Sequence, residues 1–437
     1  MLLVDRHVKA YASFVSYLLR IPYLRDPTGR RSTRFPRLWS RHMTMNIGII
    51  PQGGKNWIAG VVYVQNVIRA LNLLPNEERP ALYFILGPDS TVEDYRDLGR
   101  LLPPLKYYTF RDGARLRSKV MDSIRHAGPT RWPISLERLV RKLKLSALFP
   151  LQISLGKSFS CSWVGWIPDF QHRRMPQFFS QQEIRGRDEC FREITREADH
   201  IIVGSQDAYG DLIRWFPTVP DRVSVFPFVS VPAEDWYEPD PREIVRHFGL
   251  PAKYLIFPSQ FWIHKNHTCL FEAMRLLADG LCPDIALVCT GREHDYRHPE
   301  YARKLLADLK SFGLERNVHC LGLLPRHTQI QLVRAAVAVI QPSWFEGWSA
   351  LVEDARTLGK RIYVSDISIH REQTPLNARF FDPKSPAELA GMIAADWKLL
   401  SPGPDLARER EALAAQRQRA VDFARLFLNI IHKASKL

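Results

Sequence analysis

The stretch AAVAVIQPSWFEGWSALVEDARTLGK, residues 335–360, joins an apolar run to a glycine-started segment with acids on both sides. The run AAVAVIQPS is typical of a buried strand, and the segment from Gly347 onward is compatible with a helix. A helix N-terminus placed after a strand offers backbone N–H groups to an anion. Glu346 precedes these donors and Asp354 follows eight residues later, so the two carboxylates suit hydroxyl groups on either side of a bound phosphate.

The residues between these two acids are interpreted by their positions on the expected helix. Gly347, Trp348 and Ser349 start it and are candidate donor-binding residues for a phosphate-bearing ligand. Glu353 is adjacent to Asp354 but points about 100° away on a helix. We therefore interpret Glu353 as a solvated helix charge.

Outward from this stretch, short apolar runs alternate with helix-length segments along the whole chain. The expected strands lie in MNIGIIPQ, ALYFILG, KYYTF, SWVGWIP and HIIVGS, and then in KYLIFPS, DIALVCTG, NVHCLG, VAVIQPS and RIYVSD. Strands separated by helices indicate parallel βαβ units. The predicted fold class is α/β, with two Rossmann-like doubly wound domains.

A proline-rich passage, FPFVSVPAEDWYEPDPRE, interrupts this alternation and is typical of a linker between domains. We expect a basic N-terminal extension, a first Rossmann-like domain, a linker, a second Rossmann-like domain and a C-terminal helix that can return to the first domain. Their predicted boundaries are 1–44, 45–228, 229–242, 243–410 and 411–437.

Composition supports two globular domains, because 437 residues exceed one ordinary core and 46% are apolar. No apolar run is long enough to span a bilayer and no signal-peptide pattern precedes the first strand, which predicts an intracellular protein. Six cysteines without a C-x-x-C pair favour reduced thiols over disulfides or zinc. The basic residues lack an aromatic-interleaved motif, so nucleic acid is not an expected partner.

The net charge of +15 suggests an anionic partner or surface, and residues 1–44 alone carry a net +7. Apolar residues recur there at helical spacing, which fits an amphipathic helix on an anionic membrane face. Two alternatives stay open. The segment can be an ordinary surface helix, or a leader upstream of a true start at Met43 or Met45.

Two further sets of residues follow expected strands of the first domain. Gly53 and Gly54 come after the first strand, where glycines let a diphosphate approach backbone N–H groups, although a plain tight turn explains them equally well. Asp169 and His172 follow the aromatic strand SWVGWIP. His172 could orient an acceptor hydroxyl or accept its proton; alternatively, Asp169 caps a helix and His172 bonds locally.

Lys265 lies where the strand KYLIFPS gives way to a helix for which Asn266 is the expected N-cap. A lysine at a helix N-terminus opposes the helix dipole. That cost is explained if a phosphate lies between the ammonium group and the helix. Lys265 is therefore a candidate catalytic and donor-binding residue.

The segments FPSQFWIHKNH and PSWFEGWSALVEDARTLGKRIYVSDISIHREQ resemble the C-terminal domain of GT-B glycosyltransferases of family 4. The resemblance covers roughly residues 45–430. It implies that Glu346 contacts a donor sugar and Asp354 the nucleotide ribose, as in the family's E-x7-E motif, and that Lys265 stabilises the donor diphosphate. The family's partner arginine is absent, and Gln260 occupies its neighbourhood.

The resemblance also implies roles in the first domain. Gly53 and Gly54 resemble the family's glycine loop. The family histidine after the domain's strand has no clean match, because Pro168 falls at its place, and His172 is a candidate substitute. In such a fold the two domains face one another across a cleft, the first on the acceptor side and the second binding the nucleotide-sugar.

The function implied by this resemblance is that of a retaining hexosyltransferase, which uses a UDP- or GDP-sugar and a polysaccharide, glycolipid or other hydroxyl acceptor. No essential metal and no cofactor are expected, in agreement with the lack of a D-x-D pair. The expected location is the cytoplasm, at the inner membrane face if residues 1–44 bind anionic lipid. The alternative is a catalytically impaired nucleotide-sugar-binding protein.

Overall fold

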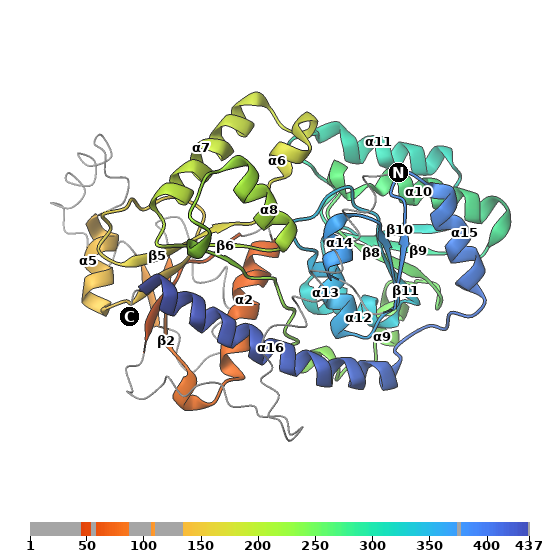
Figure 1. Ribbon diagram of the computed structural model, residues 1–437. Coiled ribbons are helices and arrows are strands. Elements are labelled where there is room, and N and C mark those ends of the chain that lie inside the picture. The colour runs from red at the N-terminus through yellow and green to blue at the C-terminus, as the bar shows by residue number, and fades with distance from the viewer. Residues whose placement is uncertain (1–44, 54–57, 87–105, 110–133, 374–376, 436–437) are drawn as a thin grey trace, which may run out of the picture. The chain divides into compact units, whose positions relative to one another are not determined.

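The structure is a computed structural model, which describes residues 45–53, 58–86, 106–109, 134–373 and 377–435. Residues 45–437 form one compact unit. The membrane-binding helix predicted within 1–44 lies outside the described residues. Figure 1 shows the two groups of strands and the helices around them.

The first sheet has seven parallel strands in the order β3-β2-β1-β4-β5-β6-β7. The strands are β1 (Asn46–Ile49), β2 (Ala81–Leu86), β3 (Lys106–Thr109), β4 (Ala147–Leu151), β5 (Ser162–Ile167), β6 (His200–Val203) and β7 (Val223–Val225). The helices of this half are α2 (Ile58–Asn72), α5 (Ile134–Leu143), α6 (Gln171–Arg174), α7 (Gln181–Glu197) and α8 (Gln206–Trp215).

Alternation along the strands builds one core on each face of this sheet. Phe84 and Leu86 belong to the core that contains α2, whereas Ile85 between them packs with residues of α5, α7 and α8. Because both faces are covered by helices, the strands are apolar throughout, as buried parallel strands require.

The second sheet has six parallel strands in the order β10-β9-β8-β11-β12-β13. The strands are β8 (Leu255–Pro258), β9 (Leu287–Thr290), β10 (Val318–Cys320), β11 (Ala338–Gln341), β12 (Ile362–Ser365) and β13 (Ala378–Phe381). The helices are α9 (Arg242–His247), α10 (His267–Leu276), α11 (Pro299–Ser311), α12 (Arg326–Ala335), α13 (Ala350–Thr357), α14 (Ser368–Gln373) and α15 (Pro386–Trp397).

The last helix, α16 (Leu406–Ser435), contacts both halves. Its residues Phe423 and Phe427 belong to the core of the first sheet. Near its start, Glu409 accepts hydrogen bonds from Arg334 of α12 at 2.8 and 3.0 Å. The exact domain boundaries expected from the sequence stay predictions.

The two doubly wound α/β sheets are confirmed, and all ten strands expected from apolar runs are present. Three strands were not expected: β4, β7 and β13. Pro150 within β4 lowers its strand signal, and the other two strands have only three and four residues. Their positions are set by pairing with neighbouring strands rather than by a local pattern.

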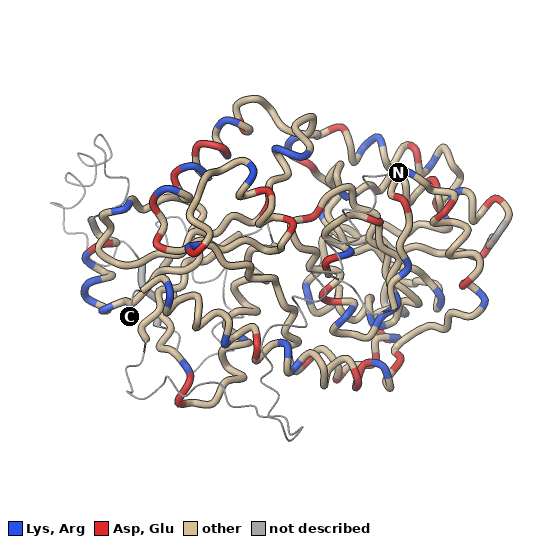
Figure 2. The backbone as a smooth tube through the Cα atoms, viewed as in Figure 1, with Lys and Arg blue, Asp and Glu red and all other residues tan. Residues whose placement is uncertain are grey.

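Surface chemistry adds three observations. In Figure 2, Lys and Arg positions are interspersed with Asp and Glu positions in both halves. Across the described part of the chain, no helix combines the length and apolar character that crossing a bilayer demands. All six cysteines are free thiols, four buried and two half-buried, as their sequence spacing suggested.

Candidate functional site

The candidate site lies beyond the carboxyl ends of β8, β11 and β12, which are consecutive neighbours in the second sheet. The chain leaves β8 toward β9 and β10 on one side and later returns to β11 on the other side, so the strand order reverses here. Open α/β sheets bind ligands outside the carboxyl ends of strands at such a switch point. Lys265 follows β8, and Glu346 follows β11.

These two residues are in direct contact. Lys265 Nζ lies 2.7 Å from Glu346 Oε1 and 2.9 Å from Oε2. Gln341, the last residue of β11, donates a further bond from Nε2 to Glu346 Oε1 at 2.7 Å. The side chain of Lys265 is 18% exposed and that of Glu346 is 8% exposed. The sequence predicted that both contact one donor molecule, and the structure brings them together.

Asn266 holds the segment that carries Lys265. It adopts a left-handed conformation with φ 60°, which asparagine tolerates better than most residues. Its side chain accepts a bond from Cys269 N at the start of α10, as expected for an N-cap. The same side chain donates from Nδ2 to Pro342 O at 3.0 Å and to Pro383 O at 2.9 Å, which ties this loop to the segments after β11 and β13.

Gly347 permits a close approach between two loops. A Cβ at this position would lie 2.5 Å from Pro168 O and 2.8 Å from Asp169 Cβ. The loop of Glu346 therefore packs against the end of β5, where the sequence placed Asp169. Asp169 is 28% exposed, and its Oδ1 accepts a bond from Gln171 N at 3.0 Å, at the start of α6.

Trp348 and Ser349 are engaged within the protein. Trp348 Nε1 donates to Phe228 O at 2.9 Å, within the proline-rich passage that begins at Phe226. Ser349 is the N-cap of α13, and its Oγ accepts from Val352 N. The Ser349 N–H donates to Gln373 Oε1 at 3.1 Å. An anion that used this N–H would have to displace the Gln373 side chain.

Asp354 is 3% exposed and carries two bonds on one oxygen. Its Oδ1 accepts from Ser230 Oγ at 2.7 Å and from Arg326 Nη2 at 2.5 Å. Arg326 also lies over the Trp236 ring, 5.2 Å from its centroid. A contact from Asp354 to a ribose would therefore use Oδ2 or replace Arg326.

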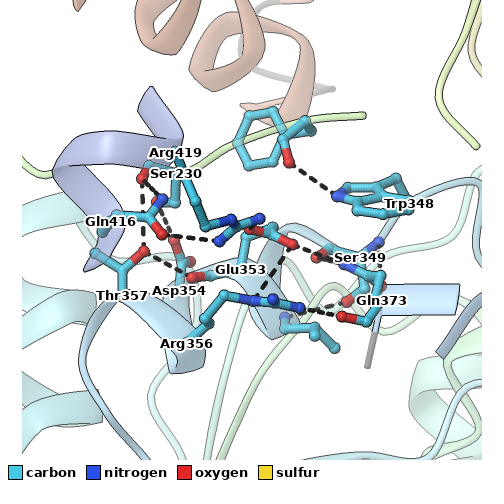
Figure 3. Close-up of polar contacts among 12 residues, drawn as sticks. Ser230, Trp348, Ser349, Glu353, Asp354, Arg356, Thr357, Gln373, Gln416 and Arg419 are labelled. Atoms are coloured by element: carbon cyan, nitrogen blue, oxygen red, sulfur yellow. Dashed lines mark hydrogen bonds and ion pairs between the residues drawn. The ribbon is translucent and has the colours of Figure 1, made fainter. Parts of the chain in front are cut away.

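The interpretation of Glu353 as a solvated charge is wrong. Glu353 is fully buried, and Arg419 of α16 donates to its Oε2 at 2.9 Å. Gln373 donates to Oε1 at 3.4 Å. Figure 3 shows Arg419 and Gln373 reaching Glu353 from different elements. Glu353 is buried by a tertiary contact, because α16 covers the face of α13 that the local amphipathic pattern would leave exposed.

His172 has a local role in this structure. It is fully buried, with Nε2 3.0 Å from Asp188 Oδ1, and its ring packs against Phe179 and Phe191. Burial lowers the pKa of His172, although the hydrogen bond to Asp188 acts in the opposite direction. The geometry favours the local alternative, and it does not support His172 as a group that reaches an acceptor. Arg173 also donates from Nε to Asp188 Oδ1 at 2.8 Å.

The remaining predicted residues lie in loops after strands. Gly53 follows β1 with φ 74°, a conformation suited to glycine, whereas Gly54 lies outside the described residues. Gln260 is half-buried after β8. Gly291, with φ 133°, packs closely against it, since a Cβ there would lie 2.9 Å from Gln260 N. In the described part of the chain, no three His, Cys, Asp or Glu side chains are grouped as a metal site.

Sequence reasoning missed four residues of this region: Ser230, Arg326, Gln341 and His370. Gln341 and His370 could have been found from the sequence, because polar residues at or beyond the carboxyl ends of strands are candidates for a site. Gln341 ends β11, and His370 follows β12. Ser230 and Arg326 could not have been found in this way, since they reach Asp354 from the linker region and from α12.

Residues 244–398 match the sequence model of the family described as Glycosyl transferases group 1. This part of the chain holds the second sheet, Lys265, Glu346 and Asp354. Two curated relatives are each named D-inositol 3-phosphate glycosyltransferase. The one from Corynebacterium efficiens is 24% identical over 238 residues, which is 51% of this chain and 55% of the relative. The one from Corynebacterium glutamicum is 26% identical over 195 residues, 42% of this chain and 45% of the relative.

The chain thus spans about half the length of the curated relatives it matches. Solved structures align over more of it. HepE from Anabaena, in complex with UDP and glucose, aligns with a TM-score of 0.63 at 17% identity, over 90% of this chain and 100% of that one. Sucrose-phosphate synthase from Thermosynechococcus elongatus aligns with a TM-score of 0.60 at 16% identity, over 90% and 98%. The GT-B fold and the resemblance to GT-B glycosyltransferases are confirmed.

Proposed function

Because residues 244–398 carry the glycosyl transferases group 1 pattern, we propose that this chain transfers a sugar from a nucleotide-diphosphate sugar to a hydroxyl acceptor. The observation that carries the proposal is the Lys265–Glu346 pair at the switch point of the second sheet. Two curated relatives are named as glycosyltransferases, which supports this reaction class.

The pair explains how a donor would be held. Each side chain satisfies the other, so neither charge is buried without a partner. A donor would separate them: Lys265 would bind the diphosphate, and Glu346 would accept hydrogen bonds from sugar hydroxyls. Both new contacts are charge-assisted, the stronger class of hydrogen bond. Stabilising charge on the departing diphosphate by a fixed ammonium group is the largest catalytic contribution expected here.

The finer activity is part of the same proposal. The transferred sugar is a hexose from a UDP- or GDP-linked donor, transfer retains the anomeric configuration, and no metal is essential. The acceptor is a polysaccharide, a glycolipid or another hydroxyl compound. Asp169 is the acceptor-side group that the geometry favours, because it packs beside the Glu346 loop and is partly exposed. The protein acts in the cytoplasm, at the inner membrane face if residues 1–44 bind anionic lipid.

A donor screen tests this proposal. Wild-type protein is incubated with UDP-, GDP- and ADP-sugars, with binding followed by calorimetry and nucleotide release by a coupled assay. Glu346→Gln keeps the size of the side chain but loses its charge. We expect it to weaken donor binding about 10- to 100-fold, since a hydrogen bond to a charged group is worth about 1.5–3 kcal/mol. Glu315→Gln, an exposed acid of the same half, is the matched control.

Two results would count against the proposal: no nucleotide release with any common donor, together with unchanged donor binding in Glu346→Gln. Donor binding without turnover would instead support the second candidate, a catalytically impaired nucleotide-sugar-binding protein. Gln260 is the observation that motivates this candidate, because it occupies the neighbourhood of the arginine that the family resemblance predicts.

A further inference from the structure

His370 is the exception among the polar residues at the end of α14. Its three neighbours are all engaged. Arg371 donates two bonds to Asp366, at 2.6 and 2.7 Å, and Glu372 accepts bonds from two backbone N–H groups at the start of α8. Gln373 bonds the backbone of Ser349. His370 is fully buried, and its Nε2 has no hydrogen-bond partner among the described residues.

The other ring nitrogen fixes the tautomer of His370. Nδ1 lies 2.9 Å from Ser365 O and 3.1 Å from Ser365 Oγ. A carbonyl oxygen can only accept, so Nδ1 must carry the hydrogen. Ser365 Oγ donates its own hydrogen to Ser343 O at 2.6 Å, which leaves its lone pairs free to accept from Nδ1. In the neutral ring, Nε2 then presents a lone pair and can only accept.

The ring is neutral near pH 7. Burial lowers the pKa of His370, and Lys265 lowers it further, while Glu346 and the carbonyl of Ser365 act in the opposite direction. A buried acceptor with no donor lowers folding stability, because it has lost its hydrogen bond to water and gained none in the protein. Such an atom in a native protein calls for an explanation, and a ligand hydroxyl is one.

The position of His370 indicates which ligand would supply that hydroxyl. α14 follows β12, and β12 is the direct neighbour of β11, whose carboxyl end leads to Glu346. Hydrogen bonds link His370 to Glu346, because Ser365 contacts His370 Nδ1 and donates to Ser343 O. Gln341 Nε2 in turn contacts both Ser343 Oγ at 3.1 Å and Glu346 Oε1 at 2.7 Å. The unpartnered lone pair is therefore part of the region where the proposed function puts the donor sugar.

We propose that His370 is a specificity-determining residue whose Nε2 accepts a hydrogen bond from one hydroxyl of the donor sugar, in addition to those accepted by Glu346. The inference rests on the proposed function and extends it to the sugar itself. The preferred donor carries a free hydroxyl at the position facing His370. A donor that is deoxygenated or substituted there leaves Nε2 unpaired and binds less well.

The test is a double-mutant cycle between His370 and the sugar. Its probes are the nucleotide-sugar selected by the donor screen, its analogues lacking one sugar hydroxyl at a time, and the bare nucleoside diphosphate. The proteins are wild type, His370→Phe, which keeps a ring without a lone pair, and His370→Gln, which can offer an amide oxygen. His247→Phe, at an exposed histidine, is the matched control.

In wild type we expect one deoxy analogue to bind roughly 5- to 100-fold more weakly than the parent sugar-nucleotide. In His370→Phe the parent should lose about the same factor, and that one analogue should bind no worse than the parent. His370→Gln should recover part of the loss. Binding of the bare nucleoside diphosphate should stay within about 2-fold in all variants, because it has no sugar to contact Nε2.

Either of two results would overturn the inference. One is that no single hydroxyl couples to His370. The other is that bare nucleoside diphosphate weakens as much as the sugar-nucleotide, which would show that His370 positions Lys265 or the loop instead. If wild type binds no sugar-nucleotide at all, the proposed function itself fails, and this extension of it fails too.

Folding of the variants is followed by thermal unfolding. If His370→Phe does not fold, ¹⁵N NMR of histidine-labelled wild type decides the question. The Nε2 resonance of His370 should be that of an unprotonated nitrogen, and it should move with the sugar-nucleotide but not with the bare diphosphate. Equal movement with both ligands contradicts the inference.

Discussion

The stretch 344–360 contains two acidic regions that behave differently. At its start, Glu346 pairs with a lysine that is partly exposed, and polar atoms close by lack partners among the described residues, namely His370 Nε2 and Gln341 Oε1. At its centre, Glu353 is fully buried and its oxygens are taken up by Arg419 and Gln373. The first region therefore has polar atoms that can bond a ligand, whereas the carboxylate oxygens of the second region are already bonded within the protein.

Helix α16 carries a second ion pair that holds a buried glutamate, like that of Glu353 and Arg419. Its Glu409 pairs with Arg334 of α12, and the two side chains are only 4% and 2% exposed. Arg334 also donates to Pro239 O and Gln331 Oε1. Saturated buried pairs of this kind hold the scaffold, because removing one partner leaves a buried charge uncompensated. The state of the bonding partners, more than charge or burial, therefore separates a binding site from a structural network.

The largest expected effect is a loss of stability when the buried pair of Arg334 and Glu409 is disrupted. Glu409→Ala strands the Arg334 guanidinium in the interior and should lower the free energy of unfolding by about 3–5 kcal/mol. Chemical denaturation of the full chain measures this loss. Glu411→Ala, at an exposed glutamate two residues along the same helix, should change it by less than about 0.5 kcal/mol. Equal effects of the two variants would mean that the pair is not structural.

The next effect separates function from stability at Lys265. Lys265→Ala should reduce the rate of sugar transfer by about 10²–10³-fold, the range seen when one preorganised donor to a developing anion is lost. Its unfolding free energy should fall by much less than that of Glu409→Ala, because Lys265 is partly exposed and Glu346 keeps the bond from Gln341. Steady-state kinetics and denaturation are measured on the same preparations. A large loss of stability with unchanged transfer would reverse the assignment of the two regions.

A smaller effect is expected at Gly347, where the site contacts the end of β5. Gly347→Ala forces a methyl group against Pro168 O and Asp169 Cβ, at a cost of about 1–3 kcal/mol typical of overpacking. Gly186→Ala is the control, since a Cβ in the exposed middle of α7 meets nothing within 4 Å. It should leave stability unchanged or raise it by up to about 1 kcal/mol. A harmless Gly347→Ala would contradict the close packing of the two loops.

Near neutral pH the smallest effect is expected from two buried histidines, His200 in β6 and His267 at the start of α10. Burial lowers the pKa of His200 to about 4 and that of His267 to about 3. The unfolded chain protonates its histidines first, near pH 6.5. The contribution of these two neutral histidines to the free energy of unfolding is therefore fully present above about pH 6.5. It is lost as the pH falls toward about 4.

Thermal unfolding between about pH 7 and pH 4.5 should show this decline. His200→Gln can still bond Ser224 Oγ, which His200 Nε2 contacts at 2.8 Å, and it cannot titrate. Its melting temperature should fall less steeply with acid than that of wild type. His432→Gln, at an exposed histidine, should follow the wild-type curve. Parallel curves for wild type and His200→Gln would exclude His200 as a source of the acid sensitivity.

The sequence predicted most of the fold because buried parallel strands are apolar throughout and helices separate them. It predicted Lys265 and Glu346 because both follow strands whose carboxyl ends meet at one edge of the sheet. The burial of Glu353 could not be predicted, since its partner Arg419 comes from a helix 66 residues further along the chain. The partners of Asp354 were hidden for the same reason, and His172 could be assigned only once Asp188 and the surrounding rings were placed.

A crystal structure with the donor selected by the screen tests the central claim most directly. We predict that the Lys265–Glu346 pair opens, with Lys265 Nζ within about 3 Å of a diphosphate oxygen and Glu346 accepting a bond from a sugar hydroxyl. A donor bound elsewhere, or bound here with the Lys265–Glu346 pair still intact, would contradict this claim.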